Sequence, residues 1–125
     1  MQTLTKAERL RSRKTISLLF EKGKSITMHP LKMLWMQTPN KEGSILQFTV
    51  AVPKKNFKRA VDRNRLKRQM REAMRKNKLS VKNFLAEKDK PCALILVFTG
   101  KETAPYKEIE DKIVVILQRL VSGMV

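Results

Sequence analysis

The chain has 125 residues, 42% of them hydrophobic, which suffices for one modest core, so we expect residues 1–125 to form a single domain. Its 28 lysines and arginines against 11 acidic residues give a formal net charge of +17, which favours a polyanionic partner, either nucleic acid or an anionic membrane surface. No run approaches the roughly 18 apolar residues of a membrane span, and the first 30 residues lack a signal-peptide core, so we expect a cytoplasmic protein with no place in the membrane.

The N-terminal residues predict a helix. Thr5 with Glu8 three residues later fits a capping box, and Ser12 is a second candidate N-cap. Apolar residues then recur at helical spacing: Ile16, Leu19 and Phe20. Gly23 is expected to end this helix.

Two strands are predicted next, over residues 31–37 and 45–52, the second with a clear apolar alternation. The residues between them favour a hairpin connection: Pro39, Asn40 and Gly43. Pro53 should end the second strand because proline cannot donate to the ladder, and residues 54–59 should form a loop.

Residues 60–77 have a strongly helical pattern. Four apolar side chains fall within one arc of about 100°, which predicts a stripe packed on the sheet: Leu66, Met70, Ala73 and Met74. The facing arc is polar and should point outward: Asn64, Lys67, Arg68, Arg71 and Arg75.

The C-terminal third predicts a short helix or turn over residues 80–86, then an apolar strand over residues 92–98 that is covered on both faces and stopped by Gly100. Cys92, the only cysteine, is expected to be a buried, inert thiol. Pro105 opens a last amphipathic helix. The resulting order is helix, strand, strand, basic helix, strand, helix, which indicates an α+β fold, a two-layer α/β sandwich.

The positive charge is concentrated. Residues 54–78 hold 12 lysines and arginines against Asp62 and Glu72, a net charge of +10, and residues 6–24 add +5. Two basic segments on a nearly neutral background indicate a directed binding face. Arginine forks match phosphate oxygens two at a time and stack on bases, and Asn64 can read a base edge or a 2′-hydroxyl, so the segment favours structured RNA.

Two other interpretations of the basic helix are weaker. A merely solvated amphipathic face would not gather so much charge on one arc. A membrane-surface helix would need bulky apolar residues, whereas this stripe has Leu66 with two methionines and an alanine.

The run Ala60-Val61-Asp62-Arg63-Asn64-Arg65-Leu66-Lys67-Arg68, followed by Arg71-Glu72-Ala73, resembles the signature of the bacterial ribonuclease P protein component. The resemblance extends through Val52-Pro53-Lys54-Lys55 upstream and to Arg9-Leu10, Leu19-Phe20 and Gly23 near the N-terminus. It covers roughly residues 9–98.

That resemblance implies an order like α-β-β-β-α-β-α, with an unusual left-handed βαβ crossover around the basic helix. It also implies a noncatalytic protein subunit of an endoribonuclease, in which a catalytic RNA with bound magnesium removes the 5′ leader from precursor tRNA. No protein residue would then be catalytic or hold a metal alone. One copy of the protein would bind one catalytic RNA.

The resemblance also implies two sets of site residues. The catalytic RNA would contact the basic segment: Lys55, Arg59, Arg63, Asn64, Arg65, Lys67, Arg68, Arg71 and Arg75. The single-stranded leader would lie in a cleft between the first helix and the sheet: Ile16, Phe20, Leu34, Met36 and Lys54. The family commonly has a phenylalanine where Ile16 stands and often an aromatic residue where Leu34 stands, so stacking of about 1 to 3 kcal/mol per base is lost at such places.

Protein-borne catalysis has little support in the residues. One histidine, His29, cannot form a general acid and base pair, and it precedes Pro30 as a turn residue would. Asp62 and Glu72 are about ten positions apart among arginines, unlike the clustered carboxylates of metal nucleases. Two alternatives remain: a ribosomal or other structural RNA-binding protein, and a stand-alone RNA-binding regulator.

Overall fold

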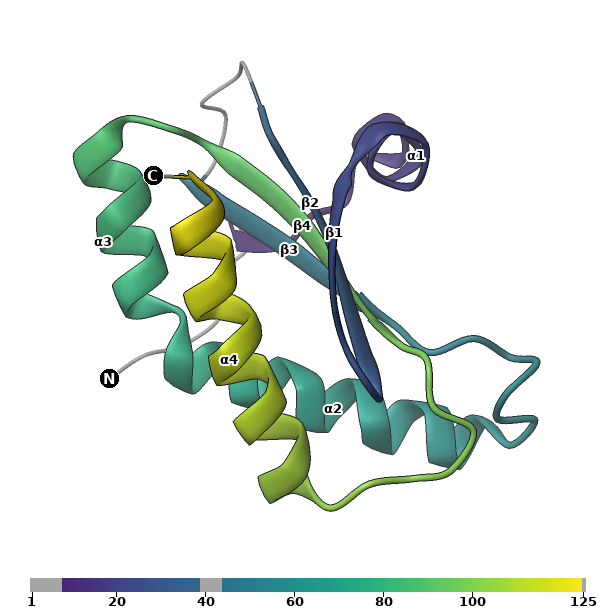
Figure 1. Cartoon of the computed structure of the whole chain (residues 1–125). Coiled ribbons are helices and arrows are strands. Elements are labelled where there is room, and N and C mark those ends of the chain that lie inside the picture. The colour runs from purple at the N-terminus through teal and green to yellow at the C-terminus, as the bar shows by residue number, and fades with distance from the viewer. Residues whose placement is uncertain (1–7, 39–43, 125) are drawn as a thin grey trace.

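The computed structural model describes residues 8–38 and 44–124. Helices and strands follow one another in a mixed order (Figure 1): α1 (Arg13–Lys22), β1 (Lys24–Met28), β2 (Leu31–Gln37), β3 (Leu46–Ala51), α2 (Ala60–Asn77), α3 (Leu79–Lys88), β4 (Cys92–Phe98) and α4 (Tyr106–Met124). The α+β class predicted from the sequence is confirmed. No helix of the described ranges is both long and apolar enough to cross a membrane.

The four strands form one sheet in the order β1-β2-β4-β3. β4 pairs antiparallel with β2 and parallel with β3, so it lies between them. The predicted hairpin joining β2 to β3 is therefore wrong, although Pro39, Asn40 and Gly43 themselves lie outside the described residues. The physical reason is that β4 is the most apolar strand and is best buried in the centre, with a partner on each edge.

The hairpin that does form joins β1 to β2, which pair antiparallel from Met28 and Leu31 outward. Its turn consists of His29 and Pro30, joined by a cis peptide bond, and His29 is exposed as a turn residue should be. β1 was not predicted from the residues, because its sequence Lys-Ser-Ile-Thr-Met is mostly polar and exposed at the sheet edge. It supplies the third strand ahead of α2 that the family resemblance implied.

Helices cover both faces of the sheet. Figure 1 shows α2 and α4 against one face and α1 against the other. β4 contributes to both sides by alternation: Leu94, Leu96 and Phe98 enter the large core under α2 and α4, whereas Ala93 and Ile95 enter a smaller cluster under α1. This confirms that β4 is covered on both faces.

Helix α1 begins and ends as its cap residues require. The Ser12 hydroxyl accepts a hydrogen bond from the Thr15 amide at 3.2 Å, which confirms Ser12 as the N-cap. Gly23 donates its amide to the Leu19 carbonyl, and a Cβ at Gly23 would collide with that oxygen, so no larger residue fits without a shift of the backbone. Thr5 lies outside the described residues, and the Glu8 carboxylate accepts from two lysines of the helical layer instead of capping a helix.

Strands β3 and β4 are parallel neighbours connected through α2 and α3, so the connection is a crossover. The left hand that the resemblance implies for it stays a prediction. Because α2 follows β3 after one loop, the crossover packs α2 against both β3 and α4.

Candidate RNA interface

The basic face is built on a buried stripe of α2. The side chains of Leu66, Met70, Ala73 and Met74 are all fully buried, against α4 and β3. Because these residues fill the core, the opposite side of α2 must face solvent. Asn64, Arg65, Arg68 and Arg71 are exposed and Lys67 is half-buried, so the predicted division of the helix into a core stripe and an outward face is confirmed.

The loop before α2 adds two exposed cations, Lys55 and Arg59. Arg59 is the N-cap residue of α2, and because a guanidinium has no hydrogen-bond acceptor it cannot cap the helix; its side chain is exposed. Lys55 lines a hollow of about 490 Å³ together with Asn56, Thr99 and Lys101. Lys101 was not among the predicted site residues, because it follows β4 and nothing in the local sequence relates it to Lys55.

Arg63, the first arginine of the signature, holds the preceding loop. Its Nη1 donates to the carbonyl oxygens of Phe57 at 2.7 Å and Lys58 at 2.9 Å. Phe57 is itself buried and packs edge-on against Phe98 of β4, with ring centroids 5.7 Å apart. Arg63 therefore shapes the loop that presents Lys55 and Arg59, and its own contact with RNA stays a prediction.

Replacing Arg63 with methionine should lower the free energy of unfolding by about 1.5 to 3 kcal/mol, because two charge-assisted hydrogen bonds to carbonyl oxygens are removed. Arg65 is exposed and serves as the matched control, with an expected change within about 0.5 kcal/mol for its methionine variant. Urea denaturation measures both. Equal stabilities of the two variants would contradict the role in the loop.

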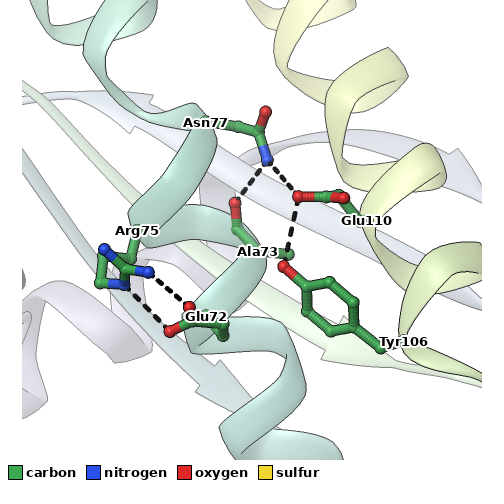
Figure 2. A network of polar contacts seen from close by, with 6 residues as sticks. All are labelled: Glu72, Ala73, Arg75, Asn77, Tyr106 and Glu110. Atoms are coloured by element: carbon green, nitrogen blue, oxygen red, sulfur yellow. Dashed lines mark hydrogen bonds and ion pairs between the residues drawn. The ribbon is translucent and has the colours of Figure 1, made fainter. Parts of the chain in front are cut away.

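Arg75 is engaged within the protein (Figure 2). Its Nε donates to Oε2 of Glu72 at 2.9 Å, and its Nη2 donates to Oε1 of the same carboxylate. The hydrogen bonds from Arg75 lower the pKa of Glu72, so this carboxylate stays charged. Half-buried and paired, Arg75 offers RNA a weaker charge than Arg68 or Arg71 does.

A second set of polar contacts in Figure 2 fastens the end of α2 to α4. The Asn77 amide donates to the carbonyl of Ala73 at 2.8 Å and to Glu110 at 3.1 Å, and the Tyr106 hydroxyl donates to the same Glu110 oxygen at 3.2 Å. Burial, followed by the nearby Glu110 charge, raises the pKa of Tyr106 to about 12, so the phenol remains a donor. These contacts set the outward face of α2 at a defined angle to the rest of the domain.

The last cation of the basic segment, Lys78, does not lie on the outward face. Its ammonium group is buried and donates to Oε1 of Glu8 at 2.7 Å, while Lys82 of α3 donates to Oε2 at 3.1 Å. The pair ties the N-terminal segment to the α2–α3 junction. It thereby brings Arg9 and Arg11 close to Arg71 around one hollow at the β3 edge.

The predicted leader cleft is only partly assembled by the structure. Ile16 and Met36 pack against the small cluster under α1, to which Leu34 belongs. Leu34 is only 8% exposed, so it serves this core. Phe20 is 59% exposed on α1, one turn after Ile16, and is the one aromatic ring presented to solvent there. Lys54 is exposed in the loop three residues beyond Ala51, which also packs on this cluster.

Within the described ranges, no three histidine, cysteine, aspartate or glutamate residues lie together as a metal would require. Cys92 is buried at the start of β4, and burial raises the pKa of its thiol to about 12. The thiol therefore stays protonated and unreactive at neutral pH, as predicted.

Comparisons with known proteins agree on one family. The family model for ribonuclease P matches residues 4–121. A ribonuclease P protein component from Porphyromonas gingivalis is 33% identical over 107 residues, which cover 86% of this chain and 78% of the relative.

Solved structures have the same fold. The RNase P protein from Thermotoga maritima superposes with a TM-score of 0.69 at 26% identity, covering 90% of this chain and 96% of that one. The Staphylococcus aureus RNase P protein superposes with a TM-score of 0.64 at 20% identity, covering 92% and 96%. With the family model matching nearly the whole chain, and with a basic face on α2 that carries the signature residues, this chain belongs to the ribonuclease P protein component family.

Proposed function

We propose that this chain is the protein subunit of ribonuclease P, which assists a catalytic RNA in the endonucleolytic removal of the 5′ leader from precursor tRNA. The observation that carries this proposal is the outward face of α2, where Asn64, Arg65, Arg68 and Arg71 are exposed on a helix whose other side is locked in the core. Because its buried stripe fixes α2 in place, the arginines are already spaced along one face before RNA binds, which lowers the entropy cost of binding folded RNA. The family membership favours this function over a ribosomal or other structural RNA-binding role.

In this proposal the chemistry belongs to the RNA. The candidate interface consists of cations, which bind phosphate and repel Mg²⁺, so the magnesium ions of the reaction would be held mainly by the RNA partner. The chain has a single histidine, which is exposed in the β1–β2 turn. The protein would contribute binding energy and charge neutralisation, which lowers the magnesium concentration that the RNA needs.

The net charge of +17 also bears on assembly. Like charges oppose self-association of the free protein, which supports a monomer that joins one catalytic RNA in a 1:1 complex. Such a complex would act in the cytoplasm, where precursor tRNA is transcribed and processed.

The direct test mixes the purified chain with a bacterial ribonuclease P RNA and precursor tRNA at a magnesium concentration too low for the RNA alone. Leader removal should be restored by the chain. RNA binding without restored cleavage would overturn the proposed function and support a structural RNA-binding protein instead.

Leader binding should depend on Phe20, because its exposed ring can stack on an unpaired base. The Phe20→Ala variant of the assembled enzyme is expected to bind precursor tRNA about 5- to 150-fold more weakly, corresponding to a stacking contribution of about 1 to 3 kcal/mol per base. Its affinity for mature tRNA, which lacks the leader, should not change. An equal loss for both tRNAs would contradict a leader contact, and the partly exposed Leu18 of the same helix provides a control through Leu18→Ala.

A further inference from the structure

A hollow of about 450 Å³ lies at the β3 edge of the sheet, next to the outward face of α2. Its floor is β3 from Phe48 to Val50, and three arginines surround it. Arg9 and Arg11 come from the segment before α1, and Arg71 comes from α2, 60 positions later in the chain.

The N-terminal segment is held firmly at this edge. The Leu10 amide donates to the Phe48 carbonyl at 3.0 Å, and Arg9 forms a parallel bridge with Phe48, so the segment adds a short stretch of pairing to the sheet. Leu10 is buried beneath α1, and Glu8 is held by Lys78 and Lys82. Anchored at these points, Arg9 and Arg11 are fixed in backbone position while their side chains remain exposed.

Within the described part of the protein, no acidic side chain is paired with the three guanidinium groups. All three side chains are exposed, and among the described residues none of these groups makes a hydrogen bond or ion pair. No acidic residue lines the hollow. Three like charges brought to one hollow repel one another, so the arrangement is stabilised when an anion enters, and arginine forks match the oxygens of a phosphate group.

We propose that this hollow is a second RNA-binding site, which takes backbone phosphates of the same RNA that lies along α2. This inference rests on the proposed function for the identity of the RNA. The two surfaces are continuous because Arg71 belongs to both: it lies on the outward face of α2 and at the rim of the hollow. One RNA strand can therefore pass from α2 over the β3 edge to Arg9 and Arg11, where the second basic segment adds its charge.

The test compares two double variants that remove the same charge. Arg9→Gln with Arg11→Gln empties the hollow of two guanidinium groups, whereas Lys88→Gln with Arg119→Gln removes two exposed cations from α3 and α4. Circular dichroism establishes that both are folded. Binding to ribonuclease P RNA is then measured against salt concentration. The log–log slope should fall by about 0.7 to 0.9 for each phosphate that the first variant can no longer bind, and by much less in the second variant.

Inorganic pyrophosphate provides a probe that needs no RNA. Its titration should shift the backbone amide resonances of Thr49 and Val50 in the wild-type chain and in the control variant, with at least tenfold weaker binding in the Arg9 and Arg11 variant. Equal salt slopes for the two double variants would overturn the second site, whatever pyrophosphate does. The two proposals can fail separately. If the wild-type chain did not restore cleavage but its RNA affinity still depended on Arg9 and Arg11, the second RNA-binding site would be supported and the proposed function would be contradicted.

Discussion

Replacing Glu8 with alanine should lower the free energy of unfolding by about 3 to 5 kcal/mol, the cost of removing one partner from a buried ion pair. The Glu8 side chain is 1% exposed and that of Lys78 is 5% exposed, with 2.7 Å between Oε1 and Nζ. Without the carboxylate, the Lys78 ammonium loses its 2.7 Å ion pair in a site that water hardly reaches. Thermal or urea unfolding of the free protein measures the effect.

Two further variants separate the stability lost by leaving a buried charge unpaired from the stability lost by removing side-chain packing. The double variant Glu8→Leu with Lys78→Met replaces the buried pair by apolar groups of similar size. It should be more stable than Glu8→Ala alone because the buried Lys78 charge is removed as well, and only the more exposed Lys82 ammonium remains at this place. Asp111→Ala breaks the exposed pair with Lys107 on α4, for which we expect a loss of stability below about 1 kcal/mol. Similar losses for Glu8→Ala and Asp111→Ala would contradict this account of the N-terminal segment.

Removing Arg68 and Arg71 together should weaken binding to ribonuclease P RNA by at least about 100-fold at low salt, since each charge-assisted hydrogen bond contributes about 1.5 to 3 kcal/mol. Both side chains are exposed on α2, opposite the buried Met70 and Met74. The log–log salt slope of the double alanine variant should be smaller by roughly 1.4 to 1.8, because two phosphates are no longer neutralised by the protein. Filter binding over a range of salt concentrations gives both quantities.

The control for this experiment is Lys88→Ala with Arg119→Ala, which changes the net charge equally but leaves α2 intact. Its salt slope should stay within about half a unit of the wild-type slope if neither side chain binds phosphate. Stability should be unaffected in both variants, because none of the four side chains is buried. A wild-type slope for the Arg68 and Arg71 variant would show that the outward face of α2 is not the RNA interface.

Several elements could be read from the sequence because their signals are local. The bounds predicted for α2, residues 60–77, agree with the structure, as do those of the strands over residues 31–37 and 92–98. A helical stripe such as Leu66, Met70 and Met74, or a run as apolar as β4, indicates its own burial within a few residues. The concentration of charge in the basic segment was visible in the same way.

The order of the strands could not be predicted from short stretches of sequence. Whether β2 pairs with β3 or with β4 depends on which arrangement buries the most apolar strand, and that is decided by the whole sheet. β1 gave no apolar signal either, because its pairing with β2 imposes the strand on a polar sequence.

The charge of the basic segment also does not tell which of its cations face solvent and which are paired within the protein. The sequence by itself determined that residues 54–78 are strongly basic, that one arc of α2 is core and the other polar, and to which family these residues are similar. Only the tertiary structure decided what each cation contacts. Arg63 donates to carbonyl oxygens of its loop, Arg75 pairs with Glu72, and Lys78 is buried against Glu8. Arg9 and Arg11, from the N-terminal segment, lie around the same hollow as Arg71. The reason is that a charged group's role depends on its partners in space, and those partners lie as many as 70 positions away in the chain.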